Sequence, residues 1–91
     1  MNRKNNYKNR DLEGGFMEVY KNLAGNIGVC EYEFGDKNIR VKLHTRQTYI
    51  YDYKYTGESH VEQMKVLACK GVGLNDYINE NVNDQYAYAL D

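Results

Sequence analysis

The most regularly spaced aromatic side chains are four tyrosines at alternate positions: Tyr49, Tyr51, Tyr53 and Tyr55. Alternation is the period of a β-strand, so the four rings share one face of that strand. Exposed rings on a sheet can stack on the bases of single-stranded RNA. The opposite face carries Asp52 and Lys54, and burying these two charges is expensive. We therefore predict that the tyrosines face the core, with a base-stacking surface as the alternative.

A ligand surface is predicted in the centre of the chain, where a basic segment, 36–54, lies between acidic blocks. The whole chain has 12 basic and 13 acidic residues and a net charge of −1, which excludes a strongly basic nucleic-acid scaffold. Cross-strand pairing with Glu31 and Glu33 would instead make this face an ordinary solvated surface. The ligand-binding candidates are Arg40, Lys42, Arg46, Tyr51 and Lys54.

The sulfur and imidazole groups match no reactive pattern. The four available metal ligands are widely separated and lack the paired short spacing of zinc sites: Cys30, His44, His60 and Cys69. Alternation places Cys30 and His44 on opposite faces of the expected sheet, which disfavours a Cys–His nucleophile pair. We predict no catalytic residues, no metal, no cofactor and no enzymatic activity.

The cysteine count and the lengths of the apolar runs predict the cellular compartment of the protein. Two cysteines outside any dense framework predict reduced thiols. The first ten residues are basic but lack the apolar stretch of a signal peptide, and no apolar run reaches the roughly 20 residues of a membrane span. We therefore expect a cytoplasmic protein with no membrane contact.

The N-terminal part of the chain is predicted to hold an arm and a helix. Residues 1–11 read as a disordered basic arm, and residues 12–91 as a single small domain. Apolar residues at helical spacing, followed by Gly25, predict a helix over 15–24. Its apolar face either folds back on the sheet or binds a partner or a second copy of the chain. The partner-binding candidates are Phe16, Val19, Tyr20 and Leu23.

Three strands with short turns are expected next. Cys30, Tyr32 and Phe34 alternate with glutamates in the first strand, and Ile39, Val41 and Leu43 alternate with polar residues in the second. The alternating tyrosines form the third strand. Short connections between consecutive strands are typical of an antiparallel meander.

Two helices are expected to complete the chain. Ser59 and Glu62 have the spacing of a capping box before a helix over 60–69, and Gly71 suits its C-terminal cap. Asn75 can cap a last helix that has Asp76 in its first turn and one apolar face formed by Ile78, Val82, Tyr86 and Ala89. The predicted class is α+β, with an N-terminal helix, a three-stranded antiparallel meander and two C-terminal helices packed on one sheet face.

Residues 31–86 resemble the KTSC domain, a small bacterial and phage module found at the C-terminus of some lysyl-tRNA synthetases. The resemblance rests on the order and spacing of short motifs: Tyr32-Glu33, the strand 39–43, a Tyr-x-Tyr pair at Tyr49 or Tyr51, the helix 61–68, Cys69-Lys70-Gly71, Asn75 and Ile78. The chain departs from the family pattern in lacking proline, in having Cys69 before Lys-Gly, and in having Leu74 before the asparagine. The association with a tRNA ligase implies contact with RNA by analogy alone.

The leading prediction is a non-enzymatic, KTSC-like binding module whose ligand is a nucleic acid, a nucleotide or a protein. One alternative is a phage or mobile-element protein that inhibits a host protein such as a defence nuclease, because its acidic blocks could mimic nucleic acid. The other is a structural homodimer, because a short chain with few aliphatic residues gains stability from a second copy.

Overall fold

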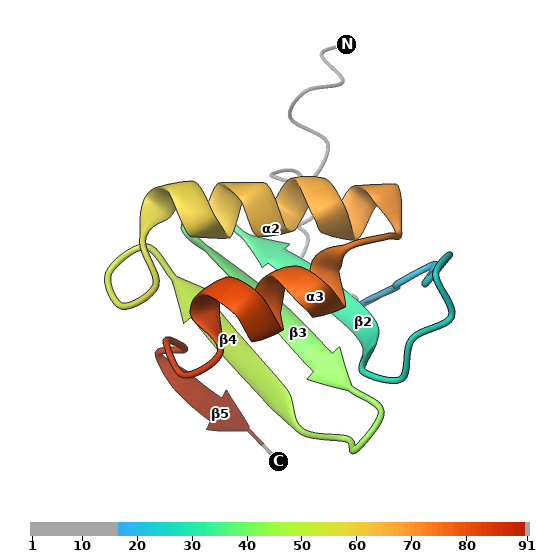
Figure 1. Cartoon of the computed structure of the whole chain (residues 1–91). Helices are drawn as coiled ribbons and strands as arrows, with labels where there is room; N and C mark the ends of the chain where they lie inside the picture. Colours follow the sequence, from blue (N-terminus) through green and yellow to red (C-terminus); the bar gives the residue numbers. More distant parts are fainter. Residues whose placement is uncertain (1–16, 91) are drawn as a thin grey trace, which may run out of the picture.

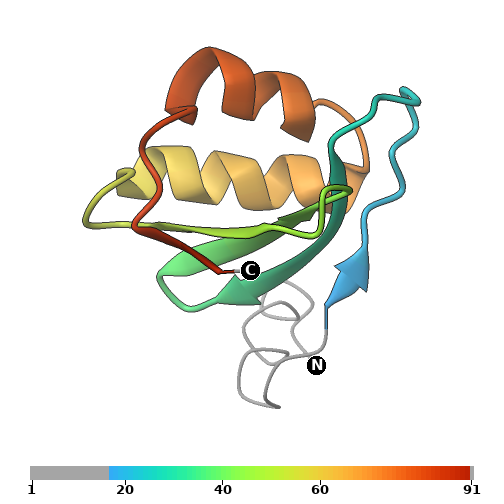
Figure 2. The same cartoon turned by 90° about the horizontal axis from the view of Figure 1, so that it is seen from below.

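The computed structural model describes residues 17–90 and places an antiparallel sheet beneath two helical segments (Figures 1 and 2). The sheet has five strands in chain order, β1-β2-β3-β4-β5. Both helical segments cover the same sheet face. The elements are β1 (Glu18–Val19), β2 (Val29–Gly35), β3 (Asn38–Leu43), β4 (Thr48–Asp52), α2 (Glu58–Lys70), α3 (Leu74–Tyr77), the π-helix η2 (Ile78–Val82) and β5 (Tyr88–Leu90).

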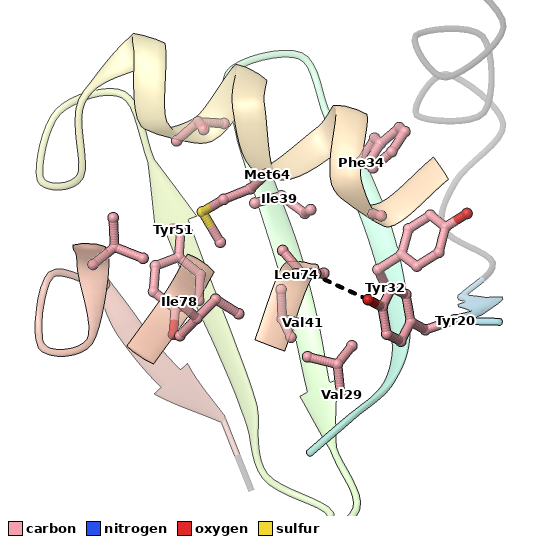
Figure 3. Close-up of a cluster of buried hydrophobic side chains, with 13 residues drawn as sticks. Tyr20, Val29, Tyr32, Phe34, Ile39, Val41, Tyr51, Met64, Leu74 and Ile78 are labelled. Carbon is pink, nitrogen blue, oxygen red and sulfur yellow. Dashed lines mark hydrogen bonds between the residues drawn. The ribbon is translucent and has the colours of Figure 1, made fainter. Parts of the chain in front are cut away.

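The core lies between the helices and the inner face of the sheet (Figure 3). Strand register sets Phe34 beside Ile39, and Ile39 beside Tyr51. Alternation therefore places these side chains on one face, where all three are buried. The helices cover them with Val61, Met64 and Ala68 from α2 and with Leu74, Ile78 and Val82 from α3 and η2.

The predicted three-stranded meander is wrong, because its strands are the middle of a five-stranded sheet. The edge strands β1 and β5 have two and three residues, too few for an alternating pattern to show in the sequence. The predicted last helix ends at Val82, and the chain then returns to pair Tyr88 with Ile50. Tyr86 and Ala89 have helical spacing but are not in a helix. The backbone of their segment forms its hydrogen bonds with the edge of β4 instead.

The predicted helix over 15–24 is also wrong across the described residues, 17–24. Glu18 and Val19 pair with β2, and Asn22 adopts a left-handed φ of 54°. The Asn22 carboxamide accepts a hydrogen bond from the Asn26 N–H at 3.0 Å and donates one to the Asn26 carbonyl at 2.7 Å. This local turn replaces the backbone bonds that a helix would make. Of its partner-binding candidates, Val19 and Leu23 are exposed, Tyr20 is buried, and Phe16 lies outside the described residues, as does the predicted arm, 1–11.

A β-bulge in β2 reverses the predicted orientation of its first residues. The register shifts between Val29, which faces Leu43, and Glu31, which faces Lys42. The extra residue turns Cys30 out to solvent and leaves Val29 as the buried residue. Simple alternation predicts the opposite, because it counts every residue of the strand as paired.

Helix α2 confirms the predicted Gly71 cap but lacks the predicted capping box. Gly71 has a φ of 79°, and its N–H bonds the carbonyls near the helix end. At the other end the helix begins one residue before Ser59, after Gly57, with no side-chain cap. The Glu62 carboxylate instead accepts a hydrogen bond from the Tyr53 hydroxyl at 2.6 Å. In residues 17–90 the structure contains no helix long and apolar enough to cross a membrane.

Replacing Tyr20 with phenylalanine should lower the free energy of unfolding by about 1–2 kcal/mol. The Tyr20 hydroxyl accepts a hydrogen bond from the Leu74 N–H at 3.1 Å, which satisfies a buried donor at the start of α3 (Figure 3). Urea unfolding followed by circular dichroism measures the loss. The control is Tyr55→Phe, since Tyr55 is exposed, and equal stabilities of the two variants would contradict this role.

Candidate ligand cleft

The predicted ligand residues lie on different parts of the sheet. Arg40 and Lys42 belong to the outer face, away from the helices, and Arg40 lies 3.7 Å from the Glu33 carboxylate. Tyr51 belongs to the inner face and is 3% exposed. A single ligand of modest size therefore cannot contact Arg40 and Tyr51 together, because the sheet separates them.

The other two basic candidates flank β4. Arg46 lies in the turn before β4, with a left-handed φ of 81°. Lys54 follows β4, and its Nζ lies 5.5 Å from the centre of the Tyr55 ring. The register of β4 puts these two positions at opposite ends of the strand. Only Tyr51 among the predicted ligand residues lies in the cleft described next.

A cleft of about 240 Å³ lies between the sheet and the segment formed by α3 and η2. Four parts of the chain converge on it: the loop before β2, the inner face of β3 and β4, the helical segment, and the loop before β5. A larger hollow of about 370 Å³ is lined, among the described residues, by α2 alone. We take the cleft as the candidate site because convergence of several elements fixes the positions of its polar groups.

The Tyr51 hydroxyl is the least expected group in the cleft. Tyr51 is 3% exposed, and no hydrogen bond joins its hydroxyl to any residue in 17–90. Buried polar groups nearly always have a partner, which can be the protein, an ordered water or a ligand, so the Tyr51 hydroxyl is open to a partner from the cleft. Burial raises the pKa of Tyr51 well above its ordinary value, and the nearby Tyr49, Tyr86 and Asp84 raise it further. The phenol therefore keeps its proton and remains a hydrogen-bond donor.

Two further tyrosines hold that donor in place. The Tyr49 and Tyr86 rings are 4.7 Å apart between centres, and the Tyr86 ring meets Tyr51 edge-on at 6.3 Å. The Tyr49 hydroxyl is already engaged, since it donates to the Gln47 side chain at 3.1 Å. Rings this close pack against one another, and the contact with Tyr86 restricts the position of the Tyr51 ring.

Three asparagines line the cleft at intervals of four residues: Asn75 in α3, Asn79 in η2 and Asn83 directly after η2. None of their carboxamides forms a hydrogen bond to the described part of the chain. Asn81, by contrast, does not line the cleft, and it donates to the Tyr77 carbonyl at 3.2 Å. The three cleft carboxamides are therefore available to a ligand. The interval of four residues was the signal in the sequence for this row, which the prediction of site residues missed.

Gly28 lines the cleft beside the carboxamide of Asn75. A Cβ added to Gly28 would lie 2.1 Å from Oδ1 of Asn75, so the carboxamide keeps its position only beside a residue without a side chain. The Gly28 carbonyl accepts a hydrogen bond from the His44 N–H at 2.8 Å, which fixes this loop to the end of β3. The Asn75 carboxamide therefore packs against the backbone of Gly28, and both residues line the cleft.

The polar groups of the described cleft lining are mainly carboxamides and phenols. This lining also has one carboxylate, Asp84, one imidazole, His44, and no lysine or arginine. In residues 17–90 no three His, Cys, Asp or Glu side chains lie close enough to hold a metal ion. Carboxamides and phenols bind ligands by hydrogen bonding and are poor nucleophiles. In comparisons with known proteins, the chain matches no protein-family model, no curated protein and no solved structure.

Proposed function

We propose that this protein is a non-enzymatic binding module that holds an uncharged or basic polar group of its ligand in the cleft. The buried and unpaired hydroxyl of Tyr51 is the observation that carries this proposal. Leaving a buried hydroxyl without a partner costs about 1–3 kcal/mol, a cost that a bound ligand would remove. The free carboxamides beside it supply further donors and acceptors.

The charges favour a protein ligand over a nucleic acid. Nucleic-acid binding depends on neutralising phosphates with lysine and arginine, and the described lining of the cleft has neither. Asp84 lines the cleft, and Asp76 and Glu80 belong to the neighbouring α3 and η2 segment without lining the cleft, so the acidic charge of this region would repel phosphate groups. An inhibitor of a host protein would be one form of such a module, whereas a homodimer with no ligand would leave Tyr51 unpaired.

Small probes should shift the side-chain amide signals of the cleft asparagines in an ¹⁵N-correlated NMR spectrum. We expect capped single amino acids to shift the signals of Asn75, Asn79 and Asn83 and to leave that of Asn81 unchanged. Gly28→Ala, which displaces the Asn75 carboxamide, should weaken binding about fivefold, equivalent to one lost hydrogen bond of about 1 kcal/mol.

Nucleosides and monosaccharides complete the panel as alternative probes. Shifts of the cleft amides by either class would keep the binding function but change the ligand. Shifts confined to other surfaces, or none at millimolar concentration from any probe, would contradict the proposal.

A further inference from the structure

The strand β5 forms an open edge of the sheet (Figure 1). It pairs with β4 on one side, and no strand of the described residues pairs with it on the other. Its three residues, Tyr88, Ala89 and Leu90, are all exposed. Proteins usually protect such an edge with charged side chains or proline, because its backbone groups can pair with another strand. The segment 85–90 contains neither, so β5 lacks this protection.

The pairing with β4 shows which backbone groups of β5 face the open edge. The Ile50 carbonyl accepts a hydrogen bond from the Ala87 N–H at 2.7 Å, so the backbone groups of Ile50 point toward the β5 side. These groups alternate in direction along a strand, so those of Tyr49 point away from β5. Ala89 lies opposite Tyr49 in a pair that is not hydrogen-bonded. The N–H and C=O of Ala89 therefore point away from β4, toward the open edge.

We propose that two copies of this chain form a two-fold symmetric dimer in which their β5 strands pair antiparallel, centred on Ala89. The two Ala89 residues lie opposite each other and exchange two backbone hydrogen bonds. The two sheets then join into one, and the contact closes because each copy uses the same edge. This inference is independent of the proposed binding function, because β5 does not line the cleft.

The side chains of β5 fit a second copy of the same strand. Alternation places Tyr88 and Leu90 on one face of β5 and Ala89 on the other. In a pairing centred on Ala89, Tyr88 of one copy lies opposite Leu90 of the other, so side chains that are 51% and 45% exposed in one chain cover each other. Charges on β5 would lie close to like charges of the second copy, and the strand has none.

The opposite edge of the sheet is less suited to such pairing. In the described part of the chain, β1 has two residues, of which Glu18 is charged. The left-handed φ of Asn22 turns the chain soon after β1. A strand of three residues still makes a small contact, and small interfaces are typical of weak complexes. We therefore expect the dimer to form at micromolar rather than nanomolar concentrations.

Sedimentation velocity on the full chain tests this inference. Between about 10 µM and 1 mM, the sedimenting mass should rise from that of one chain toward that of two. Leu90→Lys should weaken association at least about tenfold, because a lysine on the edge repels its copy. Val19→Lys is the matched control, since Val19 is also an exposed apolar residue but belongs to the opposite edge, and it should associate like the parent. A parent chain that remains monomeric at about 1 mM would overturn the inference.

Two changes at Ala89 test the backbone contact itself. Ala89→Pro removes the N–H that faces the second copy but none that pairs with β4, so the variant should show a native circular dichroism spectrum and fail to dimerise. With the exposed Cys30 and Cys69 replaced by serine, Ala89→Cys should form a disulfide-linked dimer, because Cα atoms in such a pair lie about 5.5 Å apart.

Two results would exclude β5 as the interface even if the chain dimerises. One is a dimer that persists unchanged in both Leu90→Lys and Ala89→Pro. The other is disulfide cross-linking of Val19→Cys in place of Ala89→Cys, which would assign the contact to the edge formed by β1.

Discussion

Replacing Lys65 with alanine is expected to lower the free energy of unfolding by about 3 kcal/mol, because its ammonium group is buried among groups that depend on it. Lys65 is 2% exposed although it carries a charge. Its Nζ donates to the Gly35 carbonyl at 2.8 Å and to the Asp36 carbonyl at 3.3 Å, and lies 3.2 Å from the Glu62 carboxylate. The side chain therefore fastens α2 to the turn between β2 and β3.

Thermal unfolding followed by circular dichroism measures this loss, which corresponds to a fall in Tm of roughly 10–20 °C for a domain of this size. Lys70→Ala is the matched control, since Lys70 is exposed at the end of the same helix. Lys65→Met should retain more stability than Lys65→Ala, because methionine fills the buried space that alanine leaves as a cavity. A Tm for Lys65→Ala within a few degrees of that for Lys70→Ala would show that the buried contacts contribute little.

Replacing Tyr51 with phenylalanine is expected to raise stability and to weaken ligand binding. The change removes a buried hydroxyl that has no partner in residues 17–90, so the free energy of unfolding should increase by about 1 kcal/mol. The same change removes the donor that we assign to the ligand, so affinity should fall about tenfold, the equivalent of one charge-free hydrogen bond in a buried site. Opposite effects on stability and binding are typical of functional groups placed in a core.

The matched control is Tyr49→Phe. Tyr49 lines the same cleft, but its hydroxyl is already bonded to Gln47. Removing that bond should lower stability slightly and change affinity little. A loss of stability in Tyr51→Phe would instead mean that its hydroxyl has a structural partner, and would remove the main support for the cleft as the binding site.

Alkaline titration of stability provides a second measurement on Tyr51. Burial raises its pKa in the folded state, whereas the unfolded chain releases the phenolic proton near pH 10. Above pH 10 the unfolded state therefore binds fewer protons than the native state, and stability falls as pH rises. Tyr51→Phe should reduce this slope by about 1.4 kcal/mol per pH unit, the contribution of one proton. An unchanged slope would contradict the burial of an un-ionised phenol.

The inner face of the sheet was predictable from alternation. Ile39 and Val41 are buried as expected, and Tyr51 faces the core. Tyr49 and Tyr53 are half-buried against that core, while Tyr55 is exposed because β4 ends at Asp52 and the alternation stops there. The α+β class and the helix ending at Gly71 were predictable for similar reasons, since each depends on a long periodic pattern or on a glycine that must adopt positive φ.

The candidate site was predictable only at Tyr51. Arg40, Lys42, Arg46 and Lys54 remain predicted ligand residues, but the structure places them outside the cleft. The cleft instead depends on Gly28, Asn75 and Tyr86, which come from three parts of the chain and meet through tertiary contacts. The spacing of residues along the chain predicts the faces of a single helix or strand. It does not predict which residues of different elements come into contact in the folded protein.

The sequence by itself determined which long segments are strands or helices and which faces they bury, because burial of an apolar face follows a period of two or 3.6 residues. The conformation of the short segments was decided only by the tertiary structure. Around Tyr20 a helical pattern became a strand and a turn, because its hydroxyl bonds the buried Leu74 N–H. Tyr88–Leu90 form β5 because they pair with the free edge of β4. In segments this short, local preference is worth only tenths of a kcal/mol per residue, and contacts with distant parts of the chain outweigh it.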